Sequence, residues 1–290
     1  MTSPIQLIDS GNHPVLLAAT TIPQWFESQT HTNALTTIVN AVEHQKGYAC
    51  IFGDNGSGKT TVLNAYATLA WRGNVHAIKV DGRPGNNTDF IQSILQCLRI
   101  DTQGKEPSWM RRRLQLAAQL HLANDKPLAL LIDNAQALDD QVLSQLHLLI
   151  DSSAGQERVL QIVLAGTSEL DARLRTSLLA PVNQRLAARA LLTPVEHDER
   201  IAFIQTLLTH KSMALGYDLP QRALRRIARK SRGNPASLFR LTQEALRWQH
   251  AKARPGLLRK RADHQPTKPG FSRAHTISSD STPDALLEGR

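Results

Sequence analysis

The chain has 290 residues, of which 41% are hydrophobic, and its longest apolar run, residues 128–132, is far too short to cross a membrane. The first 20 residues lack the basic start of a signal peptide, and Cys50 and Cys97 lack metal-ligand spacing, so we expect a cytoplasmic protein with reduced core cysteines and no metal of its own. The net charge of +9 comes from residues 221–290, which hold 16 Lys and Arg against 5 Asp and Glu, whereas residues 1–220 hold 18 against 20.

Apolar strand patterns alternate with helical patterns along the first two thirds of the chain. This alternation predicts an α/β fold in which helices flank a parallel sheet. The expected strands are residues 48–52, 75–80, 128–132, 160–165 and 190–192. The expected helices are one that opens at residue 61 and those at 89–98, 108–122, 142–150 and 169–179.

The segment GDNGSGKT, residues 53–60, fits the phosphate-binding loop pattern G-x-x-x-x-G-K-[ST] without a mismatch. It lies between a predicted strand and a predicted helix, where backbone N–H groups and the helix N-terminus favour an anion. Lys59 is expected to reach the β- and γ-phosphates and the Thr60 hydroxyl to ligate Mg²⁺. We therefore predict that the protein binds ATP with Mg²⁺. The predicted nucleotide-binding residues of this loop are Gly53, Asp54, Asn55, Gly56, Ser57, Gly58, Lys59, Thr60 and Thr61.

Such a loop needs a carboxylate at the tip of a neighbouring strand to hold the metal through its water shell. Asp133 directly follows the apolar run 128–132 and has this setting. We predict that Asp133 and Thr60 share the Mg²⁺; the alternative is that Asp133 merely ends a strand.

The pattern changes after residue 193. Thr193-Pro194-Val195-Glu196 combines a capping residue, a proline at the first helical position and a glutamate at the third, so a helix is predicted to start there. Three helices fit: residues 195–214, 219–231 and 235–250. The expected division is an N-terminal extension (1–20), a nucleotide-binding domain (21–193), a helical lid (194–250) and a basic, disordered tail (251–290).

Five segments give the chain a family resemblance: GDNGSGKTT, LALLIDNAQAL, LQIVLAGTSELDARL, NQRL and ALRRIARKSRGNPASLFRL. Through them it resembles the AAA+ ATPases, and within these the ExeA/GspA-like group, which is related to transposition helpers and origin-binding ATPases. The resemblance implies that Thr167, with Ser168 as a neighbouring candidate, senses the γ-phosphate. It also implies that Arg185 is an arginine finger that reaches the nucleotide of the next subunit. Residues 22–31, with Trp25 and Phe26, resemble the stretch that covers the adenine, or they pack in the core.

Two departures from the family pattern bear on catalysis. The family usually has Glu directly after the strand-end Asp to polarise the attacking water, and here this residue is Asn134. An amide cannot accept a proton, and the loss of a general base costs about 10²–10⁴-fold in rate, so slow hydrolysis or a nucleotide-held switch is expected. Gln136 is a weaker candidate for orienting the water. The family often places Arg directly after G-x-P, where this chain has Ala236, and Arg240 one turn later is the candidate substitute at the nucleotide.

Basic residues recur at spacings of three and four along the helix predicted at 219–231. The predicted nucleic-acid-binding residues are Arg222, Arg225, Arg226, Arg229 and Lys230. Such a stripe attracts phosphate backbones through counterion release without reading bases. A solvated helix face or an anionic membrane surface are the alternatives.

These features predict an AAA+ ATPase that binds and slowly hydrolyses ATP to drive homo-oligomerisation and non-specific association with DNA, as a transposition or replication helper would, with a protein partner that the sequence does not identify. One alternative is an ATPase that assists secretion or pilus assembly, as the ExeA/GspA resemblance implies. Another is a switch that holds ATP without hydrolysing it, as Asn134 implies.

Overall fold

The computed structural model describes residues 26, 28–45, 47–72, 74–83, 87–150, 159–209 and 219–253. The predicted N-terminal extension, Trp25 and nearly all of the predicted basic tail lie outside this range. The chain forms two compact units, residues 1–247 and 248–290, and the fold below is that of the first.

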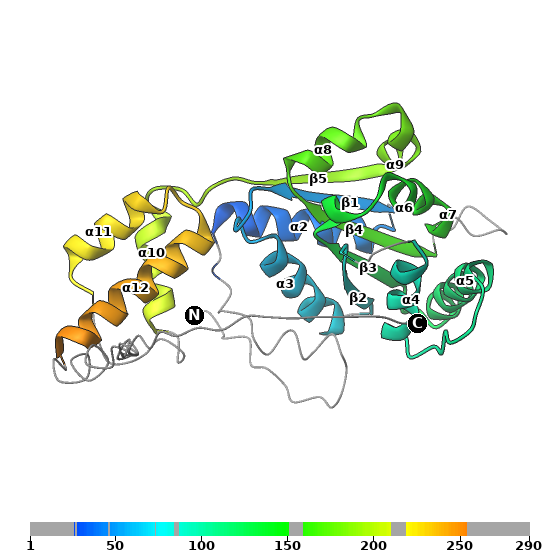
Figure 1. Cartoon of the computed structure of the whole chain (residues 1–290), viewed down its shortest axis with the longest axis horizontal. Coiled ribbons are helices and arrows are strands. Elements are labelled where there is room, and N and C mark those ends of the chain that lie inside the picture. The colour runs from blue at the N-terminus through cyan, green and yellow to red at the C-terminus, as the bar shows by residue number, and fades with distance from the viewer. Residues whose placement is uncertain are drawn as a thin grey trace, which may run out of the picture. The chain divides into compact units, whose positions relative to one another are not determined.

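The centre of the fold is a parallel five-stranded sheet in the order β2-β3-β4-β1-β5 (Figure 1). The predicted parallel α/β fold is thereby confirmed. The strands are β1 (Tyr48–Gly53), β2 (His76–Asp81), β3 (Leu128–Asp133), β4 (Leu160–Gly166) and β5 (Leu186–Leu192). β5 starts four residues earlier than predicted. Arg189 interrupts the apolar residues of this strand, and exposed residues alternate with half-buried ones in its first half.

Helices cover both faces of the sheet. One face is covered by α2 (Gln29–Glu43) and α3 (Lys59–Arg72), and the other by α4 (Asn87–Cys97), α5 (Pro107–Ala123), α6 (Asp140–Gln145), α7 (His147–Ile150), α8 (Ser168–Leu174) and α9 (Ala180–Gln184). β3 shows the division: Leu128, Leu130 and Ile132 enter the core beneath α4–α9, whereas Ala129 and Leu131 enter the core beneath α2 and α3. A strand buried on both faces reads as a continuous apolar run, and this is why the sequence predicted it.

Three helical segments differ from the prediction. α2 had no predicted counterpart. The helix expected at 142–150 is two short helices, α6 and α7, that meet at Leu146, and the helix expected at 169–179 is α8 followed by a short 3₁₀ turn at Ser177–Leu179.

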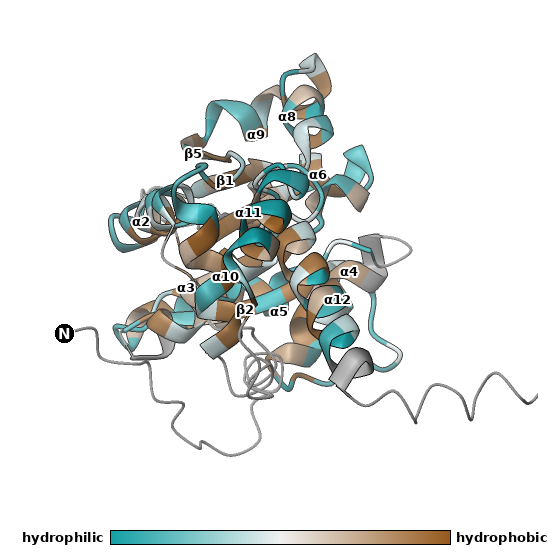
Figure 2. Cartoon of the chain, turned by 90° about the vertical axis from the view of Figure 1, so that its left-hand side faces the viewer, coloured by the Kyte–Doolittle hydropathy of each residue, from teal (hydrophilic) through white to brown (hydrophobic). Residues whose placement is uncertain are grey.

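A helical segment follows the sheet, with α10 (Glu199–Thr209), α11 (Gln221–Lys230) and α12 (Pro235–Ala253). Its core includes Phe203, Ile204, Leu224, Ile227 and Leu238. Figure 2, which faces this segment, shows hydrophilic residues along α11.

The predicted start of the first lid helix was wrong, since α10 begins at Glu199 and residues 193–196 are not helical. Val195 is fully buried, and its N–H donates to the carbonyl of Gly233 at 2.8 Å. Gly233 has φ +80°, and a Cβ there would lie 2.4 Å from the Val195 carbonyl oxygen. This tertiary contact holds residues 193–196 against the α11–α12 turn and overrides the local capping signal.

Both cysteines are free, and both pack on the core beneath α4–α9 as predicted: Cys50 is buried and Cys97 half-buried. Burial raises the pKa of each thiol. None of the helices in the described ranges combines the length and apolar character that a membrane span requires.

Candidate nucleotide site

The phosphate-binding loop connects β1 to α3 at the carboxyl edge of the sheet. Gly56 and Gly58 have φ values of +79° and +99°, a conformation that side-chain-bearing residues rarely adopt. A Cβ on Gly58 would lie 2.3 Å from Nε2 of His31. The loop therefore has no room for a larger residue at Gly58, and its backbone stays free to face phosphates.

His31, on α2, contacts the loop and lines the cavity described below, a supporting role that the sequence did not reveal. Its Nε2 lies 2.8 Å from the carbonyl oxygen of Ser57, and its Nδ1 lies 2.5 Å from the hydroxyl of Ser28. A neutral ring satisfies both contacts, with Nε2–H donating to the carbonyl and Nδ1 accepting from the hydroxyl. Burial lowers the pKa of His31, although the carbonyl of Ser57 and the charge of Glu199 oppose this shift.

The Lys59 ammonium is folded back on the loop. Its Nζ donates to the carbonyls of Gly53 at 2.7 Å and Asp54 at 2.9 Å. Burial lowers the pKa of Lys59, whereas the nearby charges of Asp133 and Asp54 raise it. A buried ammonium ringed by carbonyl oxygens is a local source of positive charge for an anion bound in the loop.

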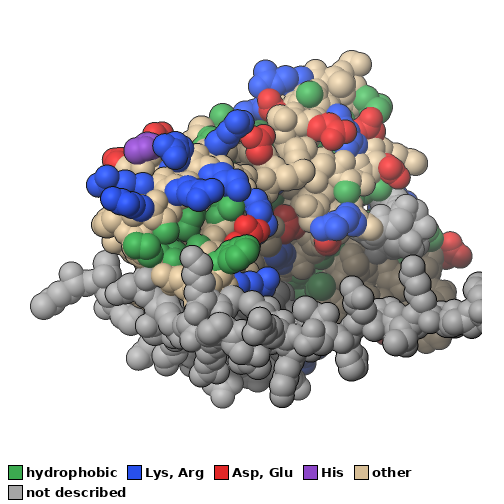
Figure 3. Space-filling view, turned by 60° about the vertical axis from the view of Figure 1, so that its left-hand side comes forward, with side chains coloured by type: hydrophobic (Ala, Val, Ile, Leu, Met, Phe, Trp, Pro, Cys, Tyr) green, Lys and Arg blue, Asp and Glu red, His purple; other side chains and the backbone are tan. Residues whose placement is uncertain are grey.

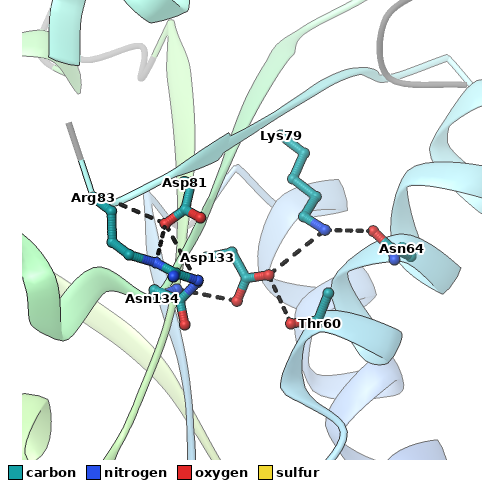
Figure 4. A network of polar contacts seen from close by, with 7 residues as sticks. All are labelled: Thr60, Asn64, Lys79, Asp81, Arg83, Asp133 and Asn134. Atoms are coloured by element: carbon teal, nitrogen blue, oxygen red, sulfur yellow. Dashed lines mark hydrogen bonds and ion pairs between the residues drawn. The ribbon is translucent and has the colours of Figure 1, made fainter. Parts of the chain in front are cut away.

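The two residues predicted to share Mg²⁺ lie together. The Thr60 hydroxyl donates to Oδ2 of Asp133 at 2.7 Å (Figure 4). Hydroxyl and carboxylate oxygens are ligands that Mg²⁺ prefers, so this pair fits the metal. Lys79, which the sequence did not indicate, lies 3.6 Å from the same Asp133 oxygen and donates to Oδ1 of Asn64 at 2.7 Å.

Asn134, next to Asp133, contacts the end of the neighbouring strand. Its Nδ2 donates to Oδ1 of Asp81 at 3.3 Å, and its backbone is left-handed with φ 52°. Asp81 ends β2 and is paired in register with Asp133 (Figure 4). The Gly82 N–H donates to the carbonyl of Asp133 at 2.7 Å, which holds the two strand ends together.

A cavity of about 380 Å³ extends from the phosphate loop to the helical segment. Its loop end includes six of the nine predicted loop residues, and Asn134 also lines it. These six are Asn55, Gly56, Gly58, Lys59, Thr60 and Thr61. Its far end is apolar, formed by Phe26, Phe203, Leu207 and Phe239, with the first two rings edge-to-face at 4.8 Å. A polar end beside an aromatic end suits a nucleotide, whose base is apolar and whose phosphates are charged.

The remaining loop residues, Gly53, Asp54 and Ser57, stand behind this cavity. Besides holding Lys59, the loop is braced by the Ser57 N–H, which donates to the carbonyl of Asp54 at 3.1 Å.

The helical segment contacts the loop through the start of α12 and the residue before it. The Ala236 N–H donates to the carbonyl of Gly56 at 3.1 Å, and Nδ2 of Asn234 donates to the carbonyl of Asn55 at 2.9 Å. Arg240 is not among the residues that line the cavity. It forms an exposed ion pair with Glu244 at 2.8 Å.

Thr167 follows β4 at the same sheet edge, and Ser168 begins α8. The hydroxyl of Thr167, the hydroxyl of Ser57 and Oε1 of Gln136 are buried without a hydrogen-bond partner among the described residues. Buried polar atoms normally have hydrogen-bond partners. The three atoms without one therefore favour a polar ligand near this edge of the sheet.

Arg185 lies away from the loop of its own chain. It directly precedes β5, whose seven residues run parallel to β1 toward the loop edge over about 20 Å. The structure therefore separates Arg185 from the other predicted catalytic residues, Lys59, Asp133, Asn134 and Thr167.

The basic stripe lies along the outer face of α11. Leu224, Ile227 and Ala228 are buried, whereas all five predicted nucleic-acid-binding residues are exposed. Within the described part of the chain, none of these five forms an ion pair with a carboxylate. Figure 3 shows Lys and Arg side chains gathered over the helical segment.

The chain matches a known protein family over part of its length. Residues 42–174 match the family described as AAA domain. General secretion pathway protein A of Aeromonas hydrophila is 28% identical over 225 residues, which cover 76% of this chain and 40% of that protein. The chain thus spans about two-fifths of the length of this relative.

Solved structures share the fold at low sequence identity. Cdc6p of Pyrobaculum aerophilum has a TM-score of 0.61 at 16% identity, covering 80% of this chain and 65% of that one. Replication initiator DnaA, bound to AMPPCP and single-stranded DNA, has a TM-score of 0.53 at 16% identity, covering 84% and 67%. Residues 42–174 thus match an AAA domain, and the chain as a whole is similar to the ExeA/GspA-like AAA+ ATPases.

Proposed function

We propose that this protein binds ATP with Mg²⁺ and hydrolyses it slowly. The observation that carries the proposal is the cavity with the phosphate loop at one end and Phe26, Phe203 and Phe239 at the other. The loop amides and Lys59 hold the phosphates, and the aromatic end holds the adenine. Nucleotide binding is general in this family, which supports the assignment.

Thr60 and Asp133 would hold the metal, Thr60 directly and Asp133 through water. Mg²⁺ supplies charge that neutralises the phosphates. Thr167, at the end of β4, then detects the γ-phosphate, and this role agrees with its unpartnered buried hydroxyl.

Hydrolysis is slow in this proposal because Asn134 stands where the family has a glutamate. An amide orients water but takes no proton from it. The contact of Asn234 and Ala236 with the loop lets the helical segment respond to the nucleotide, since both touch residues that line the phosphate end.

The proposed output is homo-oligomerisation and non-specific association with DNA. The exposed cationic face of α11, which forms no ion pair with the described residues, supports a polyanion partner. The similar DnaA structure contains single-stranded DNA, which supports DNA as that polyanion. The position of Arg185, remote from its own loop, supports a role in completing the site of another copy.

A second candidate is assistance in secretion or pilus assembly. It is favoured by the 28% identity to General secretion pathway protein A. In that function the same ATP site would act on a protein partner, and α11 would contact that partner.

Calorimetric titration of ATP with Mg²⁺ tests the proposal. We expect saturable binding by the wild type and loss of at least about tenfold in affinity for Lys59→Ala, because a charge-assisted phosphate contact is removed. Lys126→Ala, which removes an exposed lysine outside the cavity, is the matched control and should bind as the wild type does. Absence of binding by the wild type would overturn the proposal.

A further inference from the structure

The nucleotide site needs a group that can accept a proton from water, and Asn134 cannot be that group. Asp133 is already engaged: its Oδ2 accepts from Thr60 and lies near the Lys79 ammonium, and its Oδ1 accepts from the N–H of Asn134 at 3.0 Å. Asp133 is also the carboxylate proposed to hold the metal, so it is occupied in the site. The base must therefore come from elsewhere in the fold.

Asp81 meets the requirement from the adjacent strand. Among the described residues it is the one carboxylate in hydrogen-bond contact with the Asn134 side chain, at 3.3 Å (Figure 4). Its position is set by the backbone, since it is in register with Asp133 and followed by Gly82. A Cβ on Gly82 would lie 2.7 Å from the carbonyl oxygen of Asn134, so the strand end is pressed against Asn134.

The two oxygens of Asp81 have different surroundings. Oδ1 accepts from Asn134 and from the N–H and Nε of Arg83, at 3.1 and 3.3 Å. Oδ2 accepts no hydrogen bond within the part of the chain that the structure describes. The side chain is 52% exposed, so a proton taken by Oδ2 can return to solvent.

We propose that Asp81 is the general base of this ATPase, with Asn134 positioning the water that Asp81 deprotonates. This inference rests on the proposed function. In this proposal Asp81 accepts the proton and Asn134 positions the water, two roles that a single glutamate fills in the family. Asp81 thereby becomes a catalytic residue that the motif after β3 does not contain.

The water oxygen bonds to the γ-phosphorus while the bond from that phosphorus to the β–γ bridging oxygen breaks, and the electron pair leaves with ADP. The proton of the water goes to Oδ2 of Asp81. The products are ADP and inorganic phosphate, and Asp81 then releases its proton to solvent.

The test compares Asp81→Asn, Asn134→Glu and the double variant, with phosphate release and ATP affinity measured on each full-length protein. We expect Asp81→Asn to lower kcat by about 10²-fold or more, with ATP affinity within about threefold of wild type. Adding Asn134→Glu to Asp81→Asn should restore kcat to within about tenfold of wild type, because the carboxylate returns on the other strand.

Asp101→Asn is the matched control, since Asp101 also accepts from the N–H two residues ahead, at 3.0 Å, but has no contact with Asn134. It should leave kcat unchanged. Asp81→Glu, which keeps a carboxylate, should retain more activity than Asp81→Asn. If Asp81→Asn folds poorly, Asp81→Glu is compared with wild type directly.

Three results separate the possible failures. A wild type that does not bind ATP overturns the proposed function and this inference with it. A wild type that binds ATP without hydrolysing it overturns this inference and the hydrolysis step of the proposed function, leaves ATP binding standing, and favours the switch. Equal kcat for wild type and Asp81→Asn, with ATP bound by both, overturns this inference alone.

Discussion

Asn234 connects two parts of the fold with one side chain. Its Oδ1 accepts from the N–H of Ser237, which caps the start of α12, and its Nδ2 donates to the carbonyl of Asn55 in the phosphate loop. The same residue thus stabilises a lid helix and fastens that helix to the loop. The two roles use different atoms, so they can be separated by substitution.

We predict that Asn234→Asp and Asn234→Ala differ in stability but agree in nucleotide release. The aspartate keeps the capping acceptor, whereas alanine loses it at a cost of about 1 kcal/mol in the free energy of unfolding. Neither variant can donate to Asn55, so both should release a fluorescent ATP analogue severalfold faster than wild type. Denaturant unfolding and stopped-flow release measure the two effects. Release from Asn234→Asp at the wild-type rate would contradict the role in fastening.

Gly58→Ala should destabilise the protein more than Gly104→Ala. Both glycines have positive φ, but Gly104 has no atom within 4 Å of an added Cβ, whereas Gly58 faces His31. Backbone strain alone should cost Gly104→Ala about 1 kcal/mol, and crowding should bring Gly58→Ala to about 3 kcal/mol or more. Urea unfolding measures both. Equal losses would show that His31 moves aside freely.

Stability should fall as the pH decreases below about 6.5, partly because of His31. Its pKa is lowered in the folded state, so between that lowered value and 6.5 the unfolded chain binds more protons than the native chain. The contribution of His31 to the free energy of unfolding is therefore fully present above pH 6.5. It declines below that pH, by up to about 1.4 kcal/mol per pH unit. Denaturant unfolding at pH 7.5 and 5.5 should show a smaller pH difference for His31→Gln than for wild type.

His121 also has a lowered pKa, through burial and the charge of Lys126. His121→Gln therefore serves as the comparison for the residual dependence. An unchanged pH difference in His31→Gln would contradict the neutral buried ring.

Removing two charges from α11 should weaken DNA binding, and removing two from α5 should not. Arg225 and Arg226 are consecutive exposed residues on α11, and Arg112 and Arg113 are consecutive exposed residues on α5. Changing either pair to alanine lowers the net charge by two. The α11 variant should lower the slope of log affinity against log salt by about 2 on duplex DNA. Fluorescence anisotropy of labelled duplex DNA between about 50 and 200 mM salt measures this slope. Equal effects of the two variants would indicate that α11 presents only a solvated face.

Mixing Lys59→Ala with Arg185→Ala should restore ATPase activity that neither variant has alone. The first keeps the proposed finger and the second keeps the phosphate loop, so a shared site between copies would be complete. Mixing Arg185→Ala with the double variant Lys59→Ala/Arg185→Ala should restore no ATPase activity, because neither protein supplies the finger. Steady-state phosphate release measures both mixtures. Absence of recovery in the first mixture would contradict a finger that acts between copies.

The phosphate loop, Asp133 and the central strands could be predicted because their signals are continuous in sequence. A buried parallel strand is a run of apolar residues, and the loop pattern fixes its own geometry. The edge strand β5 was predicted only in its last three residues, because the exposed Arg189 interrupts its apolar residues. The other edge strand, β2, was predicted almost in full.

The supporting residues of the site could not be predicted, because tertiary contacts create their roles. His31 supports the loop from a helix, Lys79 and Asp81 come from the neighbouring strand, and Asn234 comes from the turn before α12. Val195 shows the converse, since a correct local capping pattern was overruled by its burial against Gly233. Such contacts join residues that are far apart in the sequence, so the spacing of residues does not predict them.

The parallel direction of β1 and β5 limits how copies of this protein can assemble. Lys59 follows the carboxyl end of one strand and Arg185 precedes the amino end of the other. A contact that joins the two between neighbours brings opposite ends of two sheets together. A two-fold dimer satisfies it only reciprocally, with each Arg185 in the site of the other copy, whereas a head-to-tail contact uses two different patches. Head-to-tail contacts either close into a ring or continue as a helical filament. In a filament, one terminal subunit would always hold a nucleotide that no neighbour completes.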